Sequence, residues 1–198
     1  ALHGLIPMKD GTLAYLTRRF DRKGKKKVAV EDLCQLSDLL TEQKYRASHE
    51  KTGKIIHKFS SIPGDDILRY FELIVFSFIT GNNDMHLKNF SMMTDNPSRI
   101  VLTPAYDLLS VRILLSISED PEELALTING KKNKLGLRDF LQLAETMKIP
   151  EKSAQNAMDR ICNKLEPMKE FIENSFLEDR HQMSLIGIIE RNIQILTN

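Results

Sequence analysis

Two acidic residues and one amide, Asp84, Asn89 and Asp107, have the types and the spacing that phosphoryl transfer requires. Four residues separate Asp84 from Asn89 in the polar segment 82–89, and Asp107 follows after two short strand-like pieces. Phosphoryl transfer needs a carboxylate near the acceptor hydroxyl and oxygen ligands for the Mg²⁺ that bridges the phosphates. We therefore predict that Asp84 orients or deprotonates the acceptor hydroxyl, while Asn89 and Asp107 bind Mg²⁺.

Protein kinases supply these groups in the same order, as a catalytic loop with Asp, four residues and Asn, then a hairpin and a second Asp. His86 stands two residues after Asp84, where protein kinases usually place a Lys that meets the γ-phosphate. We expect His86 to donate a hydrogen bond there. Lys88 is a second candidate for a phosphate contact, although a solvated or carboxylate-paired side chain would explain it as well. The pattern favours ATP and Mg²⁺ as the cofactors.

Other interpretations of these residues remain open. Asp and Asn are frequent in loops, so the spacing of Asp84 and Asn89 is a weak signal on its own, and an Asx turn would explain Asp84 without catalysis. A metal-dependent hydrolase is a second alternative, with Asp84, His86 and Asp107 binding an ion that activates water. A catalytically silent helical module that binds a partner is the third. The order of helix, glycine, polar loop, hairpin and second Asp favours catalysis over all of them.

A strongly apolar helix must position the polar loop. Gly64 to Asp66 begin it, and its residues 67–80 are hydrophobic on nearly every side, which predicts the central buried helix. Gly81 ends it in the manner of a C-cap glycine. After the loop, 91–93 and 99–103 read as strands around the turn signal 95–98, which predicts a β-hairpin leading to Asp107.

The rest of the pattern is mainly α. A strand is predicted over 12–20, and its pairing partner is expected to be missing or to come from another segment. Further helices are predicted over 31–40, 137–147, 151–176 and 180–196. The basic run 23–27 reads as a solvated turn.

Composition excludes several classes of function. The chain of 198 residues has 28 Lys and Arg against 27 Asp and Glu, so its net charge of +1 gives no field that would attract nucleic acid or an anionic membrane. No apolar run approaches the roughly 20 residues of a membrane span, and nothing suggests export. Cys34 and Cys162 are expected to be buried free thiols, as in a reducing, cytoplasmic protein. The remaining histidines are expected at the surface: His3, His49, His57 and His181.

Two segments resemble a known family. Residues 81–91, Gly-Asn-Asn-Asp-Met-His-Leu-Lys-Asn-Phe-Ser, and 104–110, Pro-Ala-Tyr-Asp-Leu-Leu-Ser, look like the signature segments of HipA-type serine/threonine kinases, the toxins of bacterial toxin–antitoxin modules. Arg19, Phe20 and Asp21 resemble the end of the family's hinge strand, where backbone groups meet adenine and the Asp approaches the ribose. Residues 31–35 and 44–45 are similar to the family's next helix and its trailing segment.

The resemblance implies a protein-kinase-like fold, with 1–24 as the end of the N-lobe and its hinge strand and 25–198 as the helical C-lobe. It also implies a phosphate-covering loop and a β-strand Lys in an N-terminal lobe, and the sequence contains neither. We therefore expect one part of a kinase that phosphorylates protein serine or threonine and needs the missing N-lobe. The family's partners are a substrate from translation, such as an aminoacyl-tRNA synthetase, and a helix-turn-helix antitoxin that binds DNA. No direct contact of this chain with nucleic acid is expected.

Overall fold

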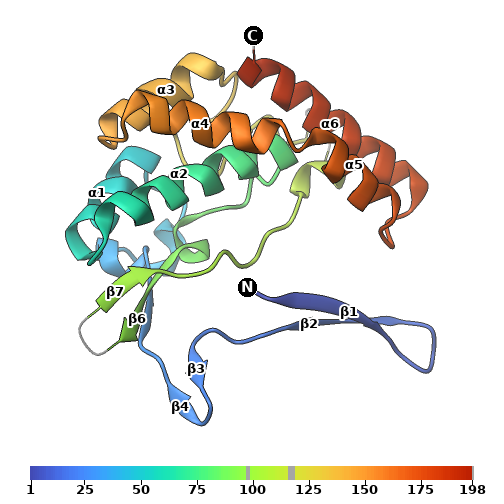
Figure 1. The fold of residues 1–198 in the computed structure, drawn as a ribbon, viewed down its shortest axis with the longest axis horizontal. Helices are drawn as coiled ribbons and strands as arrows, with labels where there is room; N and C mark the ends of the chain where they lie inside the picture. The colour runs from blue at the N-terminus through green and yellow to red at the C-terminus, as the bar shows by residue number, and fades with distance from the viewer. Residues whose placement is uncertain (97–98, 116–118, 198) are drawn as a thin grey trace.

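A helical body with a small sheet on one flank dominates the computed structural model, which describes residues 1–96, 99–115 and 119–197 (Figure 1). The helices are α1 (His49–Phe59), α2 (Pro63–Thr80), α3 (Leu137–Thr146), α4 (Glu151–Cys162), α5 (Leu165–Glu173) and α6 (Asp179–Thr197), with short 3-10 helices at Gln35–Ser37, Thr41–Gln43, Leu87–Asn89 and Val111–Ile113. The strands are β1 (His3–Pro7), β2 (Leu13–Thr17), β3 (Arg22–Lys23), β4 (Lys26–Lys27), β5 (Val30–Asp32), β6 (Ser91–Asn96) and β7 (Arg99–Leu102). The mainly α prediction agrees with this architecture.

Helix α2 forms the centre of the hydrophobic core. It contacts α1, α4, α6 and β7, and Tyr70, Phe71 and Phe78 along its length are fully buried. Its first helical residue is Pro63, a position where the missing N–H costs nothing. Gly81 ends the helix in the left-handed conformation with φ 68°. The predicted central helix and its glycine stop are thus confirmed.

The buried Asp66 fixes the first turn of α2 against the sheet. Its carboxylate accepts hydrogen bonds from the Leu102 backbone N–H at 2.9 Å, from the Ser60 hydroxyl at 2.7 Å and from the Arg69 guanidinium at 3.1 Å. A fully buried carboxylate needs such partners, because its desolvation is otherwise unfavourable by several kcal/mol. The strand that leads toward Asp107 is therefore held to the central helix.

Strands β5, β6 and β7 form an antiparallel sheet in that order. The pair of β6 and β7 occupies the stretch where the sequence predicts a hairpin, but the predicted turn residues Pro97 and Ser98 lie outside the described residues. The predicted helix over 31–40 is wrong. Asp32 and Gln35 exchange side-chain to backbone hydrogen bonds at 2.8 and 3.0 Å, which make a tight turn that competes with a helix after β5.

The C-terminal half is helical as predicted, with one difference. The single helix predicted over 151–176 is two helices, α4 and α5, because Pro167 cannot donate the backbone bond that an unbroken helix would need and its ring would clash with the carbonyl of residue 163. Pro167 is tolerated in the first turn of α5. The helices predicted over 137–147 and 180–196 agree with α3 and α6 to within a residue or two. Among the described helices, none is both long and apolar enough to cross a membrane.

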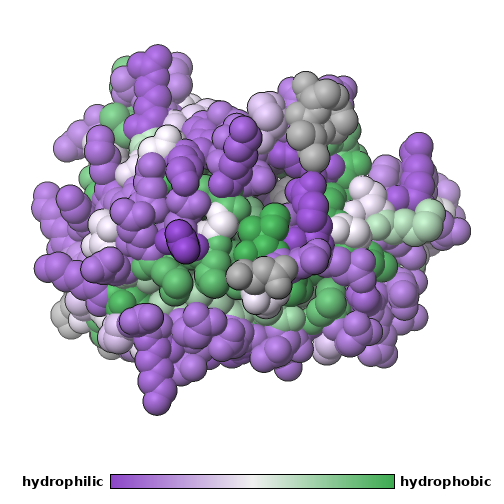
Figure 2. Space-filling view, turned by 90° about the horizontal axis from the view of Figure 1, so that it is seen from above, coloured by the Kyte–Doolittle hydropathy of each residue, from purple (hydrophilic) through white to green (hydrophobic). Residues whose placement is uncertain are grey.

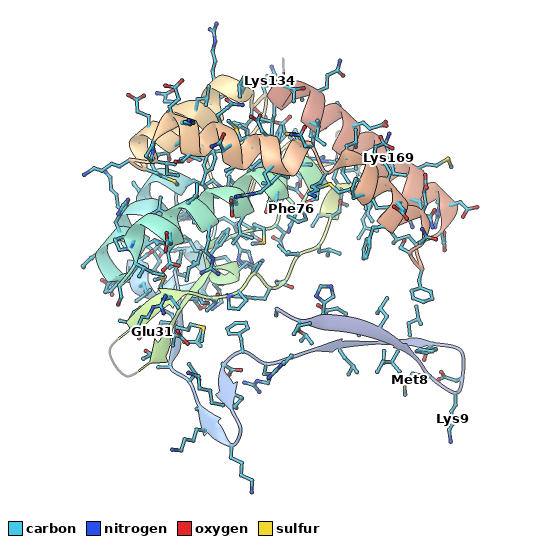
Figure 3. The ribbon with its side chains drawn as sticks, in the orientation of Figure 1. Met8, Lys9, Glu31, Phe76, Lys134 and Lys169 are labelled. Carbon is cyan, nitrogen blue, oxygen red and sulfur yellow. The ribbon has the colours of Figure 1, made fainter. Side chains whose placement is uncertain are left out.

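The N-terminal strands form a hairpin that lies apart from the helical body. Strand β2 pairs with β1 in antiparallel register, His3 opposite Thr17, so the predicted strand has its partner in a segment where no strand was predicted. The tip, with Met8 and Lys9, lies far from the helices (Figure 3). Large apolar side chains on both strands are exposed, among them Ile6 at 47% and Tyr15 at 63%. The hairpin therefore offers two uncovered apolar faces.

His49 is buried, which contradicts its predicted place at the surface. It is 1% exposed at the start of α1, a helix that the sequence pattern did not predict, and its Nδ1 lies 2.7 Å from the Tyr70 hydroxyl. Burial lowers the pKa of His49 to about 3. Among the other predictions for single side chains, Cys34 and Cys162 are confirmed as buried free thiols.

Substitution of Gly81 tests the stop of α2. A Cβ there would lie 2.8 Å from the Arg112 Cβ and 3.1 Å from the Ile188 Cγ2, in a left-handed conformation that L-residues disfavour. We expect Gly81→Ala to lower the free energy of unfolding by about 2–4 kcal/mol in denaturant titrations. Gly64→Ala is the matched control, because nothing lies within 4 Å of its Cβ position. Equal stability of the two variants would contradict the assigned role of Gly81.

The buried His49 should make stability depend on pH. Its folded pKa, about 3, lies below the ordinary 6.5, so the unfolded state binds the extra proton between these values and stability falls as the pH falls through that window. Between pH 7 and pH 5 this loss amounts to about 2 kcal/mol. In denaturant titrations at both pH values, His49→Gln should lose about that much less than the wild type. The same loss in both proteins would show that His49 is not buried in the neutral form.

Candidate active site

The loop after α2 brings Asp84 and Asn89 into direct contact. The Asn89 side-chain Nδ2 donates to the Asp84 backbone carbonyl at 3.0 Å, and the His86 N–H donates to the same carbonyl at 2.8 Å. Because the Asn89 side-chain nitrogen donates to the Asp84 carbonyl, the oxygen of the same amide points away from that carbonyl. Asn89 is 7% exposed, so this orientation is held by packing.

Tyr45 positions the Asp84 carboxylate. The Tyr45 hydroxyl donates to Asp84 Oδ1 at 2.6 Å across a sequence separation of 39 residues. Burial, together with this hydrogen bond, raises the pKa of Tyr45 to about 12, so the phenol keeps its proton at neutral pH. No role is predicted for Tyr45 from the sequence, although the residue lies in the segment 44–45 that resembles the HipA family.

His86 is a buried residue of the Asp84 loop. Its ring packs edge-on against Tyr45 with centroids 5.0 Å apart, and the residue is 6% exposed. Burial and the Lys44 charge lower the pKa of His86, whereas the charges of Asp84 and Asp107 oppose that shift. The His86 Nδ1 has no hydrogen-bond partner within the described ranges.

The segment that carries Asp107 is tied to the Asp84 loop through Tyr106. The Tyr106 hydroxyl donates to the Lys88 carbonyl at 2.8 Å and lies 2.6 Å from the Ser91 hydroxyl. The next residue, Asp107, is exposed and has a left-handed backbone with φ 55°. Such a conformation is unfavourable for a residue other than glycine by about 1–3 kcal/mol and is often found at functional sites.

A second tie joins the start of the loop to the residues after Asp107. The Asn82 amide pairs with the Leu109 backbone: its nitrogen donates to the carbonyl at 2.9 Å and its oxygen accepts from the N–H at 3.3 Å. The Arg112 N–H donates to the Gly81 carbonyl at 3.2 Å. Asn82 is 2% exposed, so these contacts are shielded from water. The two signature segments are thereby held side by side at both ends.

The predicted hinge residues reach the same region through Phe20. Its ring packs against Tyr106 with centroids 5.6 Å apart. Arg19 turns instead to Asp21, with bonds of 2.6 and 2.8 Å, and Arg22 adds a bond of 2.8 Å. The hydrogen bond from Arg19 holds the pKa of Asp21 below its ordinary value. Arg19 and Asp21 thus pair with each other. Phe20, which lies between them in the sequence, packs on Tyr106, the residue before Asp107.

Lys88 is engaged with a carboxylate. Its Nζ lies 3.2 Å from Asp32 Oδ2 in β5, which corresponds to the carboxylate-paired alternative for this side chain. The lysine side chain is 36% exposed, so this ion pair contributes little to stability. The structure places Lys88 at the edge of the site.

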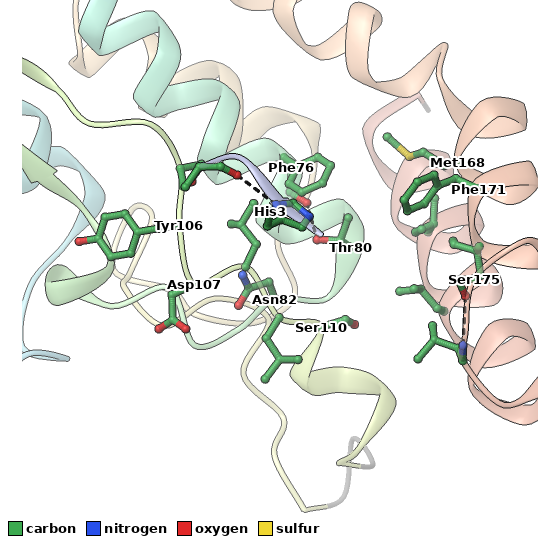
Figure 4. A pocket seen from close by; sticks show the side chains of 18 of the residues that line it. His3, Phe76, Thr80, Asn82, Tyr106, Asp107, Ser110, Met168, Phe171 and Ser175 are labelled. Carbon is green, nitrogen blue, oxygen red and sulfur yellow. Dashed lines mark hydrogen bonds between the residues drawn. The ribbon is translucent and has the colours of Figure 1, made fainter. Parts of the chain in front are cut away.

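Cavities flank the two acids. A mostly apolar cavity of about 1150 Å³ opens beside Asp107, between the N-terminal hairpin, α5 and α6. Asn82 and Asp107 lie on one side of it, and Met168 and Phe171 face them from α5 (Figure 4). A smaller cavity of about 380 Å³ adjoins Asp84. The face of the molecule seen from above is mainly polar, with an apolar band between polar side chains (Figure 2).

The set of acids and histidine does not form a cluster of the zinc type. In the part of the chain that the structure describes, no three His, Cys, Asp or Glu side chains are placed to hold a metal ion together. Asp84, His86 and Asp107 therefore do not make the ligand set that the hydrolase alternative requires. Two carboxylates with one amide oxygen are instead the hard ligands that suit Mg²⁺ shared with phosphate oxygens.

Comparisons with known proteins identify relatives of this chain. A sequence from Sinorhizobium fredii named "Putative kinase Y4dM" is 31% identical over 140 residues, which cover 70% of this chain and 34% of that protein. A Haemophilus influenzae protein also named as a kinase is 23% identical over 205 residues, covering 92% of this chain and 60% of that protein. The chain thus spans about a third to three fifths of these curated relatives.

Two solved structures share the fold. HipA of Shewanella oneidensis, solved with HipB and operator DNA, superposes with a TM-score of 0.80 at 19% identity, over 99% of this chain and 53% of that chain. The Helicobacter pylori proinflammatory kinase CtkA superposes with a TM-score of 0.60 at 14% identity, over 98% of this chain and 73% of that chain. The family model of the HipA-like C-terminal domain matches residues 1–168 of this chain. The chain therefore belongs to the HipA-like C-terminal domain family.

Proposed function

We propose that this chain is the catalytic lobe of a kinase that transfers phosphate from ATP to a protein serine or threonine. The observation that carries the proposal is the hydrogen-bonded contact between the Asp84 loop and the Asp107 segment: Asn89 is bonded to Asp84, and Tyr106, next to Asp107, is bonded to the Lys88 carbonyl. Family membership and the kinase names of its relatives support a kinase-like activity in general. The serine/threonine specificity and the residue roles are our inference.

Each site residue has a role consistent with its surroundings. Asp84, held by Tyr45, orients the acceptor hydroxyl and accepts its proton. Asn89 and Asp107 would hold Mg²⁺, which when bound offsets the charge that develops on the phosphates. His86, with its unpartnered Nδ1, is placed to donate to a phosphate oxygen if that nitrogen carries the proton.

The nucleotide base would lie on the hinge side. Phe20 supplies an apolar neighbour for adenine, and Asp21, fixed by Arg19, is the group that would approach the ribose. Lys88 would meet phosphate only by leaving Asp32. That exchange would leave the Asp32 carboxylate, which is 15% exposed, without its ammonium partner, and this opposes a phosphate role for Lys88.

Full activity should require protein outside this chain. The matched relatives are longer, and the two exposed apolar faces of the β1–β2 hairpin are a natural surface for an N-lobe that supplies the phosphate loop and the β-strand Lys. The partners of the complete kinase would be a protein substrate from translation, as the family resemblance implies, and a helix-turn-helix antitoxin. The antitoxin is supported by the similar HipA, which was solved with HipB. The alternative, a silent module, predicts no Mg²⁺-dependent binding of ATP by this chain.

Removal of a carboxylate tests the site directly. Phosphate transfer from ATP should be measured with the full-length protein that contains this chain. Asp84→Asn and Asp107→Asn should each lower kcat by about 10²- to 10³-fold, the scale of losing one preorganised charge. Asp159→Asn on the exposed face of α4 is the matched control. If Asp107→Asn stays within a few-fold of wild type, Asp107 is not a magnesium ligand.

Tyr45 should act through Asp84 as a positioning residue. Tyr45→Phe removes the 2.6 Å hydrogen bond to the carboxylate and keeps the ring packed on His86. We expect kcat to fall about tenfold, corresponding to a bond worth roughly 1.5 kcal/mol, while the KM for ATP stays unchanged. A change in the KM for ATP with constant kcat would place Tyr45 in nucleotide binding instead.

A further inference from the structure

The cavity of about 380 Å³ beside Asp84 lies outside the nucleotide site described above. Its walls include Tyr45, Asn83 and Asp84 from one part of the chain and Asp120, Glu122 and Lys132 from another. None of the residues assigned to magnesium or to the nucleotide lines it. Asp84 is thus the one proposed catalytic group that faces this cavity.

Acidic side chains outnumber basic ones in the lining of the cavity. Three carboxylates, from Asp84, Asp120 and Glu122, line it against the single ammonium of Lys132, which lies 3.0 Å from Glu122 Oε2. These acids are not arranged as a metal site, since the described residues contain no group of three such ligands. The charge therefore suits an organic cation with several N–H donors better than a metal ion.

Asn83, which also lines the cavity, has an unfilled hydrogen-bond acceptor. The residue is 8% exposed, and its Oδ1 has no partner among the described residues. Its Nδ2 donates to Asp120 Oδ2 at 2.5 Å and to the Glu122 carbonyl at 3.0 Å, which fixes the orientation of the amide. A buried acceptor left without a donor is unfavourable by about 1–3 kcal/mol. An N–H group entering the cavity would satisfy it.

Hydrogen bonds hold the acidic wall of the cavity in place. The Arg112 guanidinium donates to the carbonyls of Asp120 and Glu122, and the Glu122 N–H donates to Asp120 Oδ1 at 2.9 Å. Arg112 is also bonded through its backbone to Gly81 at the end of α2. The cavity is thus anchored to the same helix end that positions Asp84.

We propose that this cavity binds the arginine or lysine side chain of the protein segment that carries the acceptor hydroxyl. The inference rests on the proposed kinase function, because it assigns the substrate side of Asp84. A cation bound between Glu122 and the Asn83 amide oxygen would bring a hydroxyl a few residues away along the substrate to the Asp84 carboxylate. The cavity then selects basic sequences next to the phosphorylated residue.

The test uses the full-length protein and a set of serine peptides that differ only at one residue near the serine. Each position on either side of the serine carries arginine in one peptide and its uncharged analogue citrulline in the other. At one position or more, arginine should raise kcat/KM by at least about tenfold, mainly through KM. Glu122→Gln should reduce this preference to within about threefold, and Lys132→Met, which removes the neutralising ammonium, should increase it.

Opposite effects of these two substitutions would not follow from a loss of folding. Glu145→Gln, an exposed acid on α3, is the control that should keep the wild-type preference. Binding of the same fluorescent peptides, measured by anisotropy without ATP, gives a readout independent of catalysis. It should show the same dependence on arginine and on Glu122.

The two readouts separate the possible failures. Phosphorylation without any preference for arginine would overturn the role of the cavity and leave the kinase function intact. Binding that prefers arginine and depends on Glu122, with no phosphate transfer to any peptide, would overturn the kinase function alone. Binding indifferent to arginine and to Glu122 would overturn the inference even in the absence of activity.

Discussion

The close contact between the end of α2 and the segment after Asp107 is the constraint on which the site depends. Gly81 can turn in the left-handed conformation only because it lacks a Cβ, which would meet Arg112 at 2.8 Å. That turn buries Asn82, whose amide pairs with the Leu109 backbone. Segments far apart in the sequence, the loop after α2 and the residues after Asp107, are thereby brought side by side.

The helical body makes this contact rigid. Asn192 of α6 is 4% exposed and donates to the Phe78 carbonyl at 2.7 Å, close to the point where α2 ends. At the other end of α2, the buried Asp66 holds Leu102 of β7, and β7 leads into the Asp107 segment. Because α2 is fixed at both ends within a close-packed core, small displacements of the loop would require repacking of the core.

Asp84 lies between two surroundings of different chemistry. On one side are the buried imidazole of His86 and the amide of Asn89, which suit phosphate and Mg²⁺. On the other is a cavity whose carboxylates and amide oxygen suit an N–H donor. Tyr45 contacts Asp84 and His86 and also lines that cavity, so a single phenol connects the two sides of Asp84.

The sequence by itself determined the central helix, its glycine stop and the order of Asp84, Asn89 and Asp107, because apolar periodicity and glycine act locally. It failed for 31–40, where the leucine spacing suggested a helix but pairing of β5 with β6 and the Asp32–Gln35 turn prevailed. Only the tertiary structure revealed Tyr45, Tyr106 and the acidic cavity. These depend on hydrogen bonds and charges between residues distant in the chain, and no local pattern encodes which of them will meet.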